Sequence, residues 1–354
     1  MKFASILLLI LTCVGLRAES RKSGTFTNPL LPVGPDPWVE YKDGVYYYMN
    51  TTVKNLTLWK THSMADLRSA EKKVVWTPPA TGPYSHDIWA PEVHFLEGKW
   101  YIYFAADAGA NHTHRIWVIE NASADPFQGE WALKGKVADS TDKWAIDASV
   151  FKDQGKLYLI WSGWEGDENG TQSIYIARLK NPWTVESERT RISTPQYAWE
   201  KVGDLNPKRK IPGDPEHIDV NEGPEILKHE NKIFLIYSAS GCWTDNYSLG
   251  MLTADSGADL LNPASWKKSA TPVFHQSPEA HVYATGHNSF FKSPDGKEDW
   301  LLYHANSKPD QGCGWHRAPR AQPFTWNSDG TPNFGTPVPA AKPLQRPSGE
   351  STKN

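Results

Sequence analysis

Hydrophobic residues along the chain recur in short runs that come in pairs, with a polar turn between the two members of each pair. Each turn carries Gly or Asn, which adopt positive φ at little cost, and the second run of each pair is rich in aromatic and β-branched residues. This pattern predicts five β-hairpins, at residues 40–48, 95–103, 151–161, 227–237 and 291–303.

The hairpins are followed by another candidate strand, for example at residues 57–60, 115–119, 173–177 and 247–251. Units of roughly 55 to 75 residues with three or four strands each are typical of propeller blades. We therefore predict an all-β fold, a five-bladed β-propeller over residues 24–339. A two-sheet sandwich also has many short strands but does not predict similar units. A parallel α/β sheet is disfavoured because no helical run is long enough for a crossover.

The two ends of the chain differ in composition from the repeats. Residues 1–18 contain an apolar run at residues 6–11 and end in smaller residues, which predicts a secretory signal peptide with cleavage after Ala18 or Gly15. Residues 340–354 are rich in Pro and polar side chains, which predicts a disordered polar C-terminal tail. No later stretch is apolar and long enough to span a bilayer, so no membrane association is expected.

Secretion also fits the Cys content and the glycosylation motifs. After removal of the signal peptide the chain keeps Cys242 and Cys313, which form either one disulfide or two separate buried thiols. The pair His112 and His114 is too short a motif for a metal site, and we expect a surface loop there. Six N-x-Ser/Thr sequons would accept glycans in a eukaryotic host, at Asn50, Asn55, Asn111, Asn121, Asn169 and Asn246.

The aromatic content says more about the expected ligand than the net charge does. Seventeen Trp and 14 Tyr residues are many for 354 residues, and flat, partly polar rings suit stacking on sugars as well as packing between sheets. The formal net charge is −3, and no run of Lys and Arg could follow a phosphate backbone. Nucleic acid is therefore not an expected partner.

Acidic residues occur at corresponding places in the repeats, just before or at the start of hydrophobic strands. In a propeller the innermost strands surround the axis, so residues at one level of the blades meet in a central pocket. Carboxylates are costly to bury beside apolar strands unless something uses or compensates them. The residues at this level are Asp36, Glu92, Asp147, Glu222 and, in the last repeat, His287.

Such a group of carboxyls matches the needs of glycosidic bond hydrolysis. One protonated acid donates to the leaving oxygen, a second, ionised carboxylate activates water or attacks directly, and a third can raise the pKa of the acid by repulsion. Each residue also has a structural interpretation, because Asp before Pro caps turns and Glu222 precedes Gly-Pro. We expect Glu92 to be structural or to point away from the substrate, since two acids suffice. The residues alone do not assign the roles.

At these motifs the sequence resembles glycoside hydrolase family 43, five-bladed propellers that cleave arabinose- and xylose-containing polysaccharides, over about residues 28–338. The resemblance implies that Asp36, in a D-P context, is the general base. It implies that Asp147, in I-D followed by Phe151, positions and tunes the acid. It also implies that Glu222, in E-G-P, is the general acid.

Further matches to the family concern the rim and axis of the propeller. Gly286-His287 matches a segment whose His often lies near an axial metal ion or water, so His287 is a candidate metal ligand or buried hydrogen-bonding residue. Arg317, five residues before Gln322, matches a substrate-binding Arg, and Trp89 is placed to stack on a sugar or to pack. The family implies inversion, for which the carboxyls of Asp36 and Glu222 should be roughly 6.5 to 9.5 Å apart.

Three segments, at residues 238–244, 284–290 and 320–326, look most like arabinofuranosidase-type members of the family. We therefore expect a secreted, monomeric exo-acting α-L-arabinofuranosidase acting on arabinan or arabinoxylan. No organic cofactor is implied, and an axial calcium or other ion would be structural. Endo-arabinanase and β-xylosidase activities remain open, as does a non-catalytic carbohydrate-binding propeller.

Overall fold

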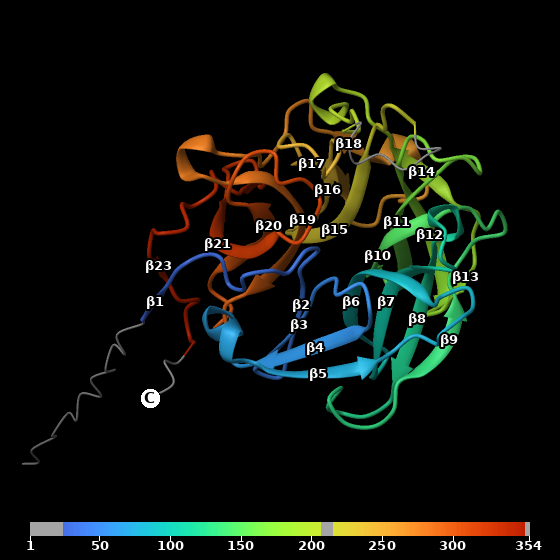
Figure 1. The fold of residues 1–354 in the computed structure, drawn as a ribbon, viewed down its shortest axis with the longest axis horizontal. Coiled ribbons are helices and arrows are strands. Elements are labelled where there is room, and N and C mark those ends of the chain that lie inside the picture. The colour runs from blue at the N-terminus through green and yellow to red at the C-terminus, as the bar shows by residue number, and fades with distance from the viewer. Residues whose placement is uncertain (1–23, 207–214, 351–354) are drawn as a thin grey trace, which may run out of the picture.

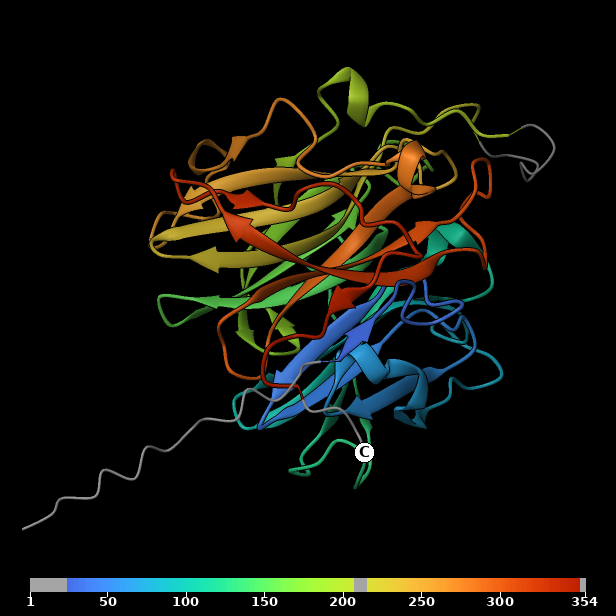
Figure 2. The ribbon, with the colours of Figure 1, turned by 90° about the vertical axis from the view of Figure 1, so that its left-hand side faces the viewer.

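Five antiparallel sheets stand around a common axis in the computed structural model, which describes residues 24–206 and 215–350 (Figure 1). This arrangement confirms the predicted five-bladed propeller. In the side view, the strands cross the thickness of the molecule and loops join them at both ends (Figure 2). Short 3₁₀ helices lie in the loops: η1 (Met64–Ser69), η2 (Asn111–Thr113), η3 (Ala198–Glu200), η4 (Pro263–Ser265) and η5 (Pro278–Ala280).

The blades follow one another in chain order, each beginning with its innermost strand. Blade 1 consists of β2 (Trp38–Lys42), β3 (Val45–Met49), β4 (Leu56–Thr61) and β5 (Glu71–Trp76), and blade 2 of β6 (His86–Leu96), β7 (Lys99–Asp107), β8 (Arg115–Asn121) and β9 (Ala132–Lys136). Blade 3 has five strands: β10 (Ala145–Asp153), β11 (Lys156–Gly163), β12 (Ser173–Asn181), β13 (Thr184–Val185) and β14 (Thr190–Ser193). Blade 4 consists of β15 (Asn221–His229), β16 (Lys232–Ala239), β17 (Ser248–Asp255) and β18 (Lys267–Lys268), and blade 5 of β19 (Tyr283–Lys292), β20 (Asp299–Asn306), β21 (Ala318–Trp326) and β22 (Pro332–Asn333).

The hydrophobic core is divided into layers between neighbouring blades. One cluster joins blades 1 and 2 through Trp38 and Trp100, and similar clusters lie between each later pair of blades. A fifth cluster packs Tyr46 of blade 1 against Trp300 of blade 5. Both faces of a blade are therefore covered, which explains why the strands carry long apolar runs rather than strict alternation. Within the described residues, no helix has the length and apolar character needed to cross a membrane.

The two ends of the described chain pair with each other outside the ring. Strand β1 (Thr25–Phe26) pairs with β23 (Leu344–Gln345), and Glu350 is buried, where it accepts hydrogen bonds from Ser63 Oγ (2.6 Å) and the Met64 amide (2.7 Å). The prediction of disorder from residue 340 is therefore wrong for residues 340–350. Polar composition suggested solvation, but the carboxylate instead satisfies amides at the start of η1. The predicted signal peptide and residues 351–354 lie outside the described residues.

Two of the six sequons are not accessible in the folded protein. The Asn50 and Asn121 residues are 6% and 1% exposed, and their side chains donate to the carbonyls of Thr51 and Gln128. The expectation that all six accept glycans is therefore wrong for these two, because a glycan would have to displace packed structure.

Local distortions at the starts of the inner strands turn side chains toward the axis. Register shifts interrupt β6, β10, β15 and β19 near these points, and each carries a residue with positive φ. Positive φ is costly for residues other than Gly, and bulges of this kind are common next to active sites. The equivalent residues are Asp36 (φ 55°), Ala90 (φ 42°), Asp147 (φ 55°), Gly223 (φ 51°) and His287 (φ 47°).

The register of blade 2 differs from the one the repeat suggested. Ala90, not Glu92, occupies the position equivalent to Asp36, so Glu92 falls two residues further along β6. There Glu92 is buried with its Oε2 2.9 Å from Nε2 of His94. Glu92 does not line the pocket described below, in agreement with the expected structural role.

A second group of carboxyls lies on the inner strands beyond the distorted positions. Glu92 and Glu225 are buried, and Glu225 accepts a hydrogen bond from Ser149 Oγ at 2.9 Å. Burial raises the pKa of Glu225 to about 8, and it raises that of Glu40 to about 7 although Lys42 opposes the shift. Burial and the neighbouring charge of Glu225 also raise the pKa of Glu92. These groups are more stable protonated in the folded protein.

We expect Glu225→Gln to make the free energy of unfolding less dependent on pH. Because the folded-state pKa of Glu225 is raised from 4.5 to about 8, its stabilising contribution is complete below pH 4.5 and is lost as the pH rises through about 8. Glutamine keeps an acceptor for Ser149 without the charge. Urea unfolding should show that the wild type loses on the order of a few kcal/mol across this window and the variant less.

Glu130→Gln, at an exposed turn, provides the matched control and should leave the pH dependence unchanged. Equal slopes for Glu225→Gln and the wild type would show that Glu225 is not the group that titrates.

Candidate active site

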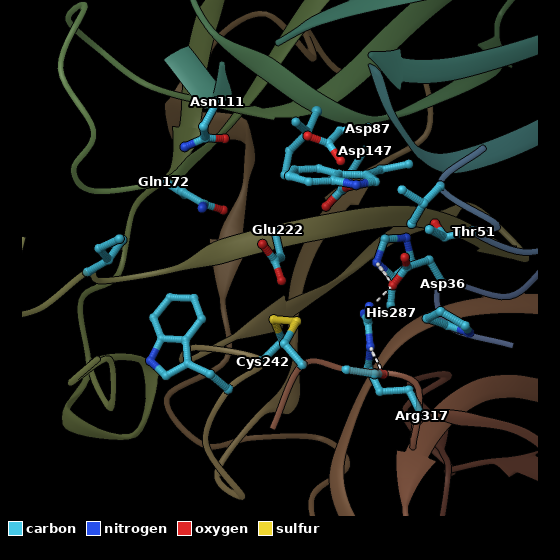
Figure 3. A pocket seen from close by; sticks show the side chains of 18 of the residues that line it. Asp36, Thr51, Asp87, Asn111, Asp147, Gln172, Glu222, Cys242, His287 and Arg317 are labelled. Carbon is cyan, nitrogen blue, oxygen red and sulfur yellow. Dashed lines mark hydrogen bonds and ion pairs between the residues drawn. A yellow bond between two sulfur atoms is a disulfide. The ribbon is translucent and has the colours of Figure 1, made fainter. Parts of the chain in front are cut away.

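A pocket of about 760 Å³ opens at one end of the propeller axis. Its floor is formed where the inner strands begin, and its wall by the loops that connect the blades (Figure 3). All six residues singled out from the sequence line it, although they come from all five blades: Asp36, Trp89, Asp147, Glu222, His287 and Arg317.

Asp36 is held among positively charged and polar groups. Arg317 Nη1 lies 2.7 Å from Asp36 Oδ1, and Nδ1 of His287 lies 3.4 Å from the same oxygen (Figure 3). The Asp36 amide donates to Nδ1 of His304 at 3.0 Å. Burial alone would raise the pKa of Asp36, but Arg317 and the two histidines outweigh burial and hold that pKa well below its usual range. Asp36 is therefore an ionised carboxylate at any physiological pH.

Glu222 lies in the same pocket, but its pKa is shifted in the opposite direction. It is 8% exposed, and its Oε1 accepts a hydrogen bond from the Tyr247 hydroxyl at 2.8 Å. Burial raises the pKa of Glu222 to about 7, the Tyr247 hydrogen bond opposes the shift, and the charge of Asp36 adds to it. A carboxyl with this pKa can give up a proton near neutral pH.

Asp147 is hydrogen-bonded to the backbone next to Glu222. Its Oδ2 accepts a hydrogen bond from the Gly223 amide at 3.0 Å, so it fixes the peptide next to Glu222. Burial and the charges of Glu222 and Asp36 raise the pKa of Asp147, although the Gly223 hydrogen bond opposes them. Asp147 is thus placed to hold Glu222 in position.

Trp89 presents only part of its ring to the pocket. The other side stacks on His114, with ring centroids 4.0 Å apart and planes 26° from parallel. His114 is fully buried, and its Nδ1 lies 3.4 Å from Asp107 Oδ2. The expected surface loop is therefore correct for the exposed His112 but wrong for His114. The ring stacking and the contact with Asp107 were not visible in the His-x-His motif.

His287 does not belong to a cluster that fits a metal ion. Among the described residues, no group of three or more His, Cys, Asp or Glu side chains could hold a metal. The Nδ1 of His287 faces Asp36, its amide donates to Ser238 Oγ at 2.7 Å, and burial lowers its pKa. We therefore derive no step through an axial ion.

A disulfide forms part of the pocket wall. Cys242, after β16, is bonded to Cys313, after β20, which answers the question left open by the sequence. Both cysteines line the pocket together with Glu222 and Arg317 (Figure 3). The disulfide joins blades 4 and 5 at the pocket.

Several residues that hold the carboxyls are not marked by any motif in the sequence. Tyr247 and His304 contact Glu222 and Asp36, and their rings are parallel with centroids 5.7 Å apart. Gly286 allows this packing, because an added Cβ would lie 2.0 Å from Tyr247 Cε1. The contact of His304 with Asp36 joins blades 5 and 1, and Tyr247 lies 25 residues from Glu222 within blade 4, so no local motif announces either contact.

One carboxyl whose pKa is lowered and a second whose pKa is raised lie in one pocket of a five-bladed propeller, an arrangement that suits glycoside hydrolysis. The sequence model of "Glycosyl hydrolases family 43" matches residues 26–332 of the chain. The chain belongs to this family.

Several proteins with known sequences or structures resemble this family 43 member. It is 41% identical to an "Extracellular exo-alpha-(1->5)-L-arabinofuranosidase" of Streptomyces avermitilis over 91% of the chain and 65% of that relative. It is 38% identical to a protein of the same description from Streptomyces chartreusis, over 82% of the chain and 85% of that relative. The crystal structure of an alpha-L-arabinofuranosidase from Lactobacillus brevis has a TM-score of 0.81 and 37% identity, covering 90% of this chain and 98% of that one. The chain thus spans slightly less than two thirds of the Streptomyces avermitilis relative.

Proposed function

We propose that the protein is a secreted, monomeric exo-acting α-L-arabinofuranosidase that releases arabinofuranose from arabinan or arabinoxylan with inversion. The observation that carries the proposal is the pairing of an ionised Asp36 with a proton-bearing Glu222 in one pocket. The described activity of the relatives supports arabinofuranose as the released sugar, and the apolar segment within residues 1–18 supports secretion.

In the proposed mechanism Asp36 removes a proton from a water molecule as that water attacks the anomeric carbon. Glu222 gives its proton to the departing glycosidic oxygen, so the bond breaks without an unstable alkoxide. Arg317 and His287 keep Asp36 ionised, and Asp147 fixes the Gly223 peptide and thereby Glu222. Water is the only co-reactant.

Product analysis tests the proposal. The secreted protein and its Glu222→Gln variant are incubated with linear and branched arabino-oligosaccharides, arabinoxylan and xylobiose. Free arabinose alone from the wild type, and none from the variant, supports the proposal. Mixed oligosaccharides would indicate an endo-arabinanase, xylose a β-xylosidase, and no product from any substrate a binding module.

The stereochemical part is tested separately by proton NMR during the first turnovers. Inversion of an α-linked substrate gives β-L-arabinofuranose first, and mutarotation follows. First appearance of the α-anomer would mean retention.

A further inference from the structure

Trp315 is the most unusual side chain on the surface of the pocket. It is 56% exposed, and the large hydrophobic residues with high exposure among the described residues are Val33, Val74, Leu133 and Trp315. Of these four, only Trp315 lines the pocket. An aromatic ring left in water beside a catalytic centre has not been placed there by core packing.

The segment that carries Trp315 is anchored on both sides. Cys313 is bonded to Cys242 on the neighbouring blade, and Arg317 is paired with Asp36 at 2.7 Å. Arg317 also donates from its amide and from Nε to the Gly314 carbonyl, at 3.4 and 3.3 Å. Two residues of chain extend at most about 7 Å, so Trp315 stays close to the residue that binds Asp36.

A second tryptophan is brought to the same wall by the same disulfide. Trp243 directly follows Cys242 and also lines the pocket. Its indole Nε1 donates to the Asp204 carbonyl at 3.0 Å, and its ring lies on Gly241, where an added Cβ would be 2.3 Å from Cε2. The ring of Trp243 is therefore fixed in position, whereas that of Trp315 is open to a ligand.

The charge of the pocket changes between its centre and this wall. Asp36 and Glu222 are 7% and 8% exposed at the centre, whereas the wall segment of Cys242, Trp243, Cys313, Gly314 and Trp315 has no ionisable side chain. Flat aromatic faces bind the C–H faces of sugar rings and release water from both surfaces. Trp89 cannot offer two free faces, since His114 covers one of them.

We propose that Trp315, supported by Trp243 and the Cys242–Cys313 disulfide, is the binding site for the sugar on the leaving side of the scissile bond. The ligand is the next pentose of an arabino-oligosaccharide, stacked on the indole while the terminal arabinose lies between Asp36 and Glu222. This inference rests on the proposed function, because it divides one substrate between two parts of the pocket. The enzyme thus selects a chain end that carries a further sugar over a simple arabinoside.

The test compares two substrates that differ only on the leaving side, α-1,5-linked arabinotriose and methyl α-L-arabinofuranoside. We expect Trp315→Ala to lower kcat/KM on arabinotriose about tenfold, chiefly through KM, which is the size of one aromatic contact. Its kcat/KM on the methyl glycoside should change less than twofold. Trp315→Tyr, which keeps a flat ring, should retain most of the activity on arabinotriose, and Trp315→Leu should not. Leu133→Ala removes an exposed apolar side chain on β9 and serves as the control.

Equal losses on both substrates, or no loss on arabinotriose, would overturn the proposal. Binding of arabinotriose to the Glu222→Gln variant, followed by calorimetry, separates this inference from the proposed function. Weaker binding when Trp315→Ala is added supports the sugar site even if the wild type releases no arabinose. Unchanged binding would refute the site even in an active arabinofuranosidase.

Discussion

Glu222→Gln is expected to lower kcat/KM on arabinotriose by about 10²- to 10⁴-fold, the usual contribution of a general acid. Glutamine preserves an acceptor for Tyr247 but has no proton of suitable acidity for the leaving oxygen. The loss should be much smaller on an aryl arabinofuranoside with a highly acidic phenol, because that leaving group departs without protonation. Steady-state kinetics on both substrates measures the difference.

The pH profile provides an independent check of the same assignment. Because the pKa of Glu222 is raised to about 7, wild-type kcat/KM should fall as the pH rises through 7 and the acid loses its proton. The alkaline fall should be absent from the residual activity of Glu222→Gln. Equal losses on the two substrates, or an unchanged alkaline limb, would mean that another group donates the proton.

Asp36→Ala is the second change for which we expect a loss of about 10²- to 10⁴-fold, since no group would then take the proton of the attacking water. Azide is a small anion that attacks carbon without losing a proton, and the shortened side chain leaves room for it. Added azide should therefore restore part of the activity and give arabinofuranosyl azide, which chromatography and mass spectrometry detect.

In the Asp36→Ala variant, the alkaline fall of the kcat/KM pH profile should also move to lower pH. The charge of Asp36 raises the pKa of Glu222, whereas Arg317 lowers it, so removing Asp36 leaves Arg317 unopposed. Asp147→Ala is the matched comparison, because its carboxyl is buried nearby but bonded to the Gly223 amide. Azide rescue of Asp147→Ala rather than Asp36→Ala would assign water activation to Asp147.

The fold and the main site residues were predictable because both depend on short-range patterns. Each hairpin is encoded by two short hydrophobic runs and a turn with Gly or Asn, and the repetition of the hairpins implies the ring. Once a ring is assumed, residues before successive hairpins converge, which is how Asp36, Asp147 and Glu222 could be grouped. The structure places all three in one pocket.

The sequence was less informative wherever the outcome depends on sheet register or on contacts between blades. Ala90 rather than Glu92 occupies the inward position of blade 2, because Glu92 lies just after the register shift that β6 shares with β10, β15 and β19. Tyr247 reaches Glu222 from the loop before β17 of the same blade, whereas His304 reaches Asp36 from the neighbouring blade. Nothing in their local sequence indicates either contact. The C-terminal segment was misjudged because composition does not show that Glu350 has a buried partner in η1.

The ion pair between Asp36 and Arg317 has a consequence for the order of events during biosynthesis. The two residues are 281 positions apart, and the other groups that keep Asp36 ionised, His287 and His304, also belong to blade 5. A chain that lacks its last blade would therefore leave Asp36 without Arg317, His287 and His304. The surroundings of the base are complete only when blade 5 packs against blade 1 and closes the ring.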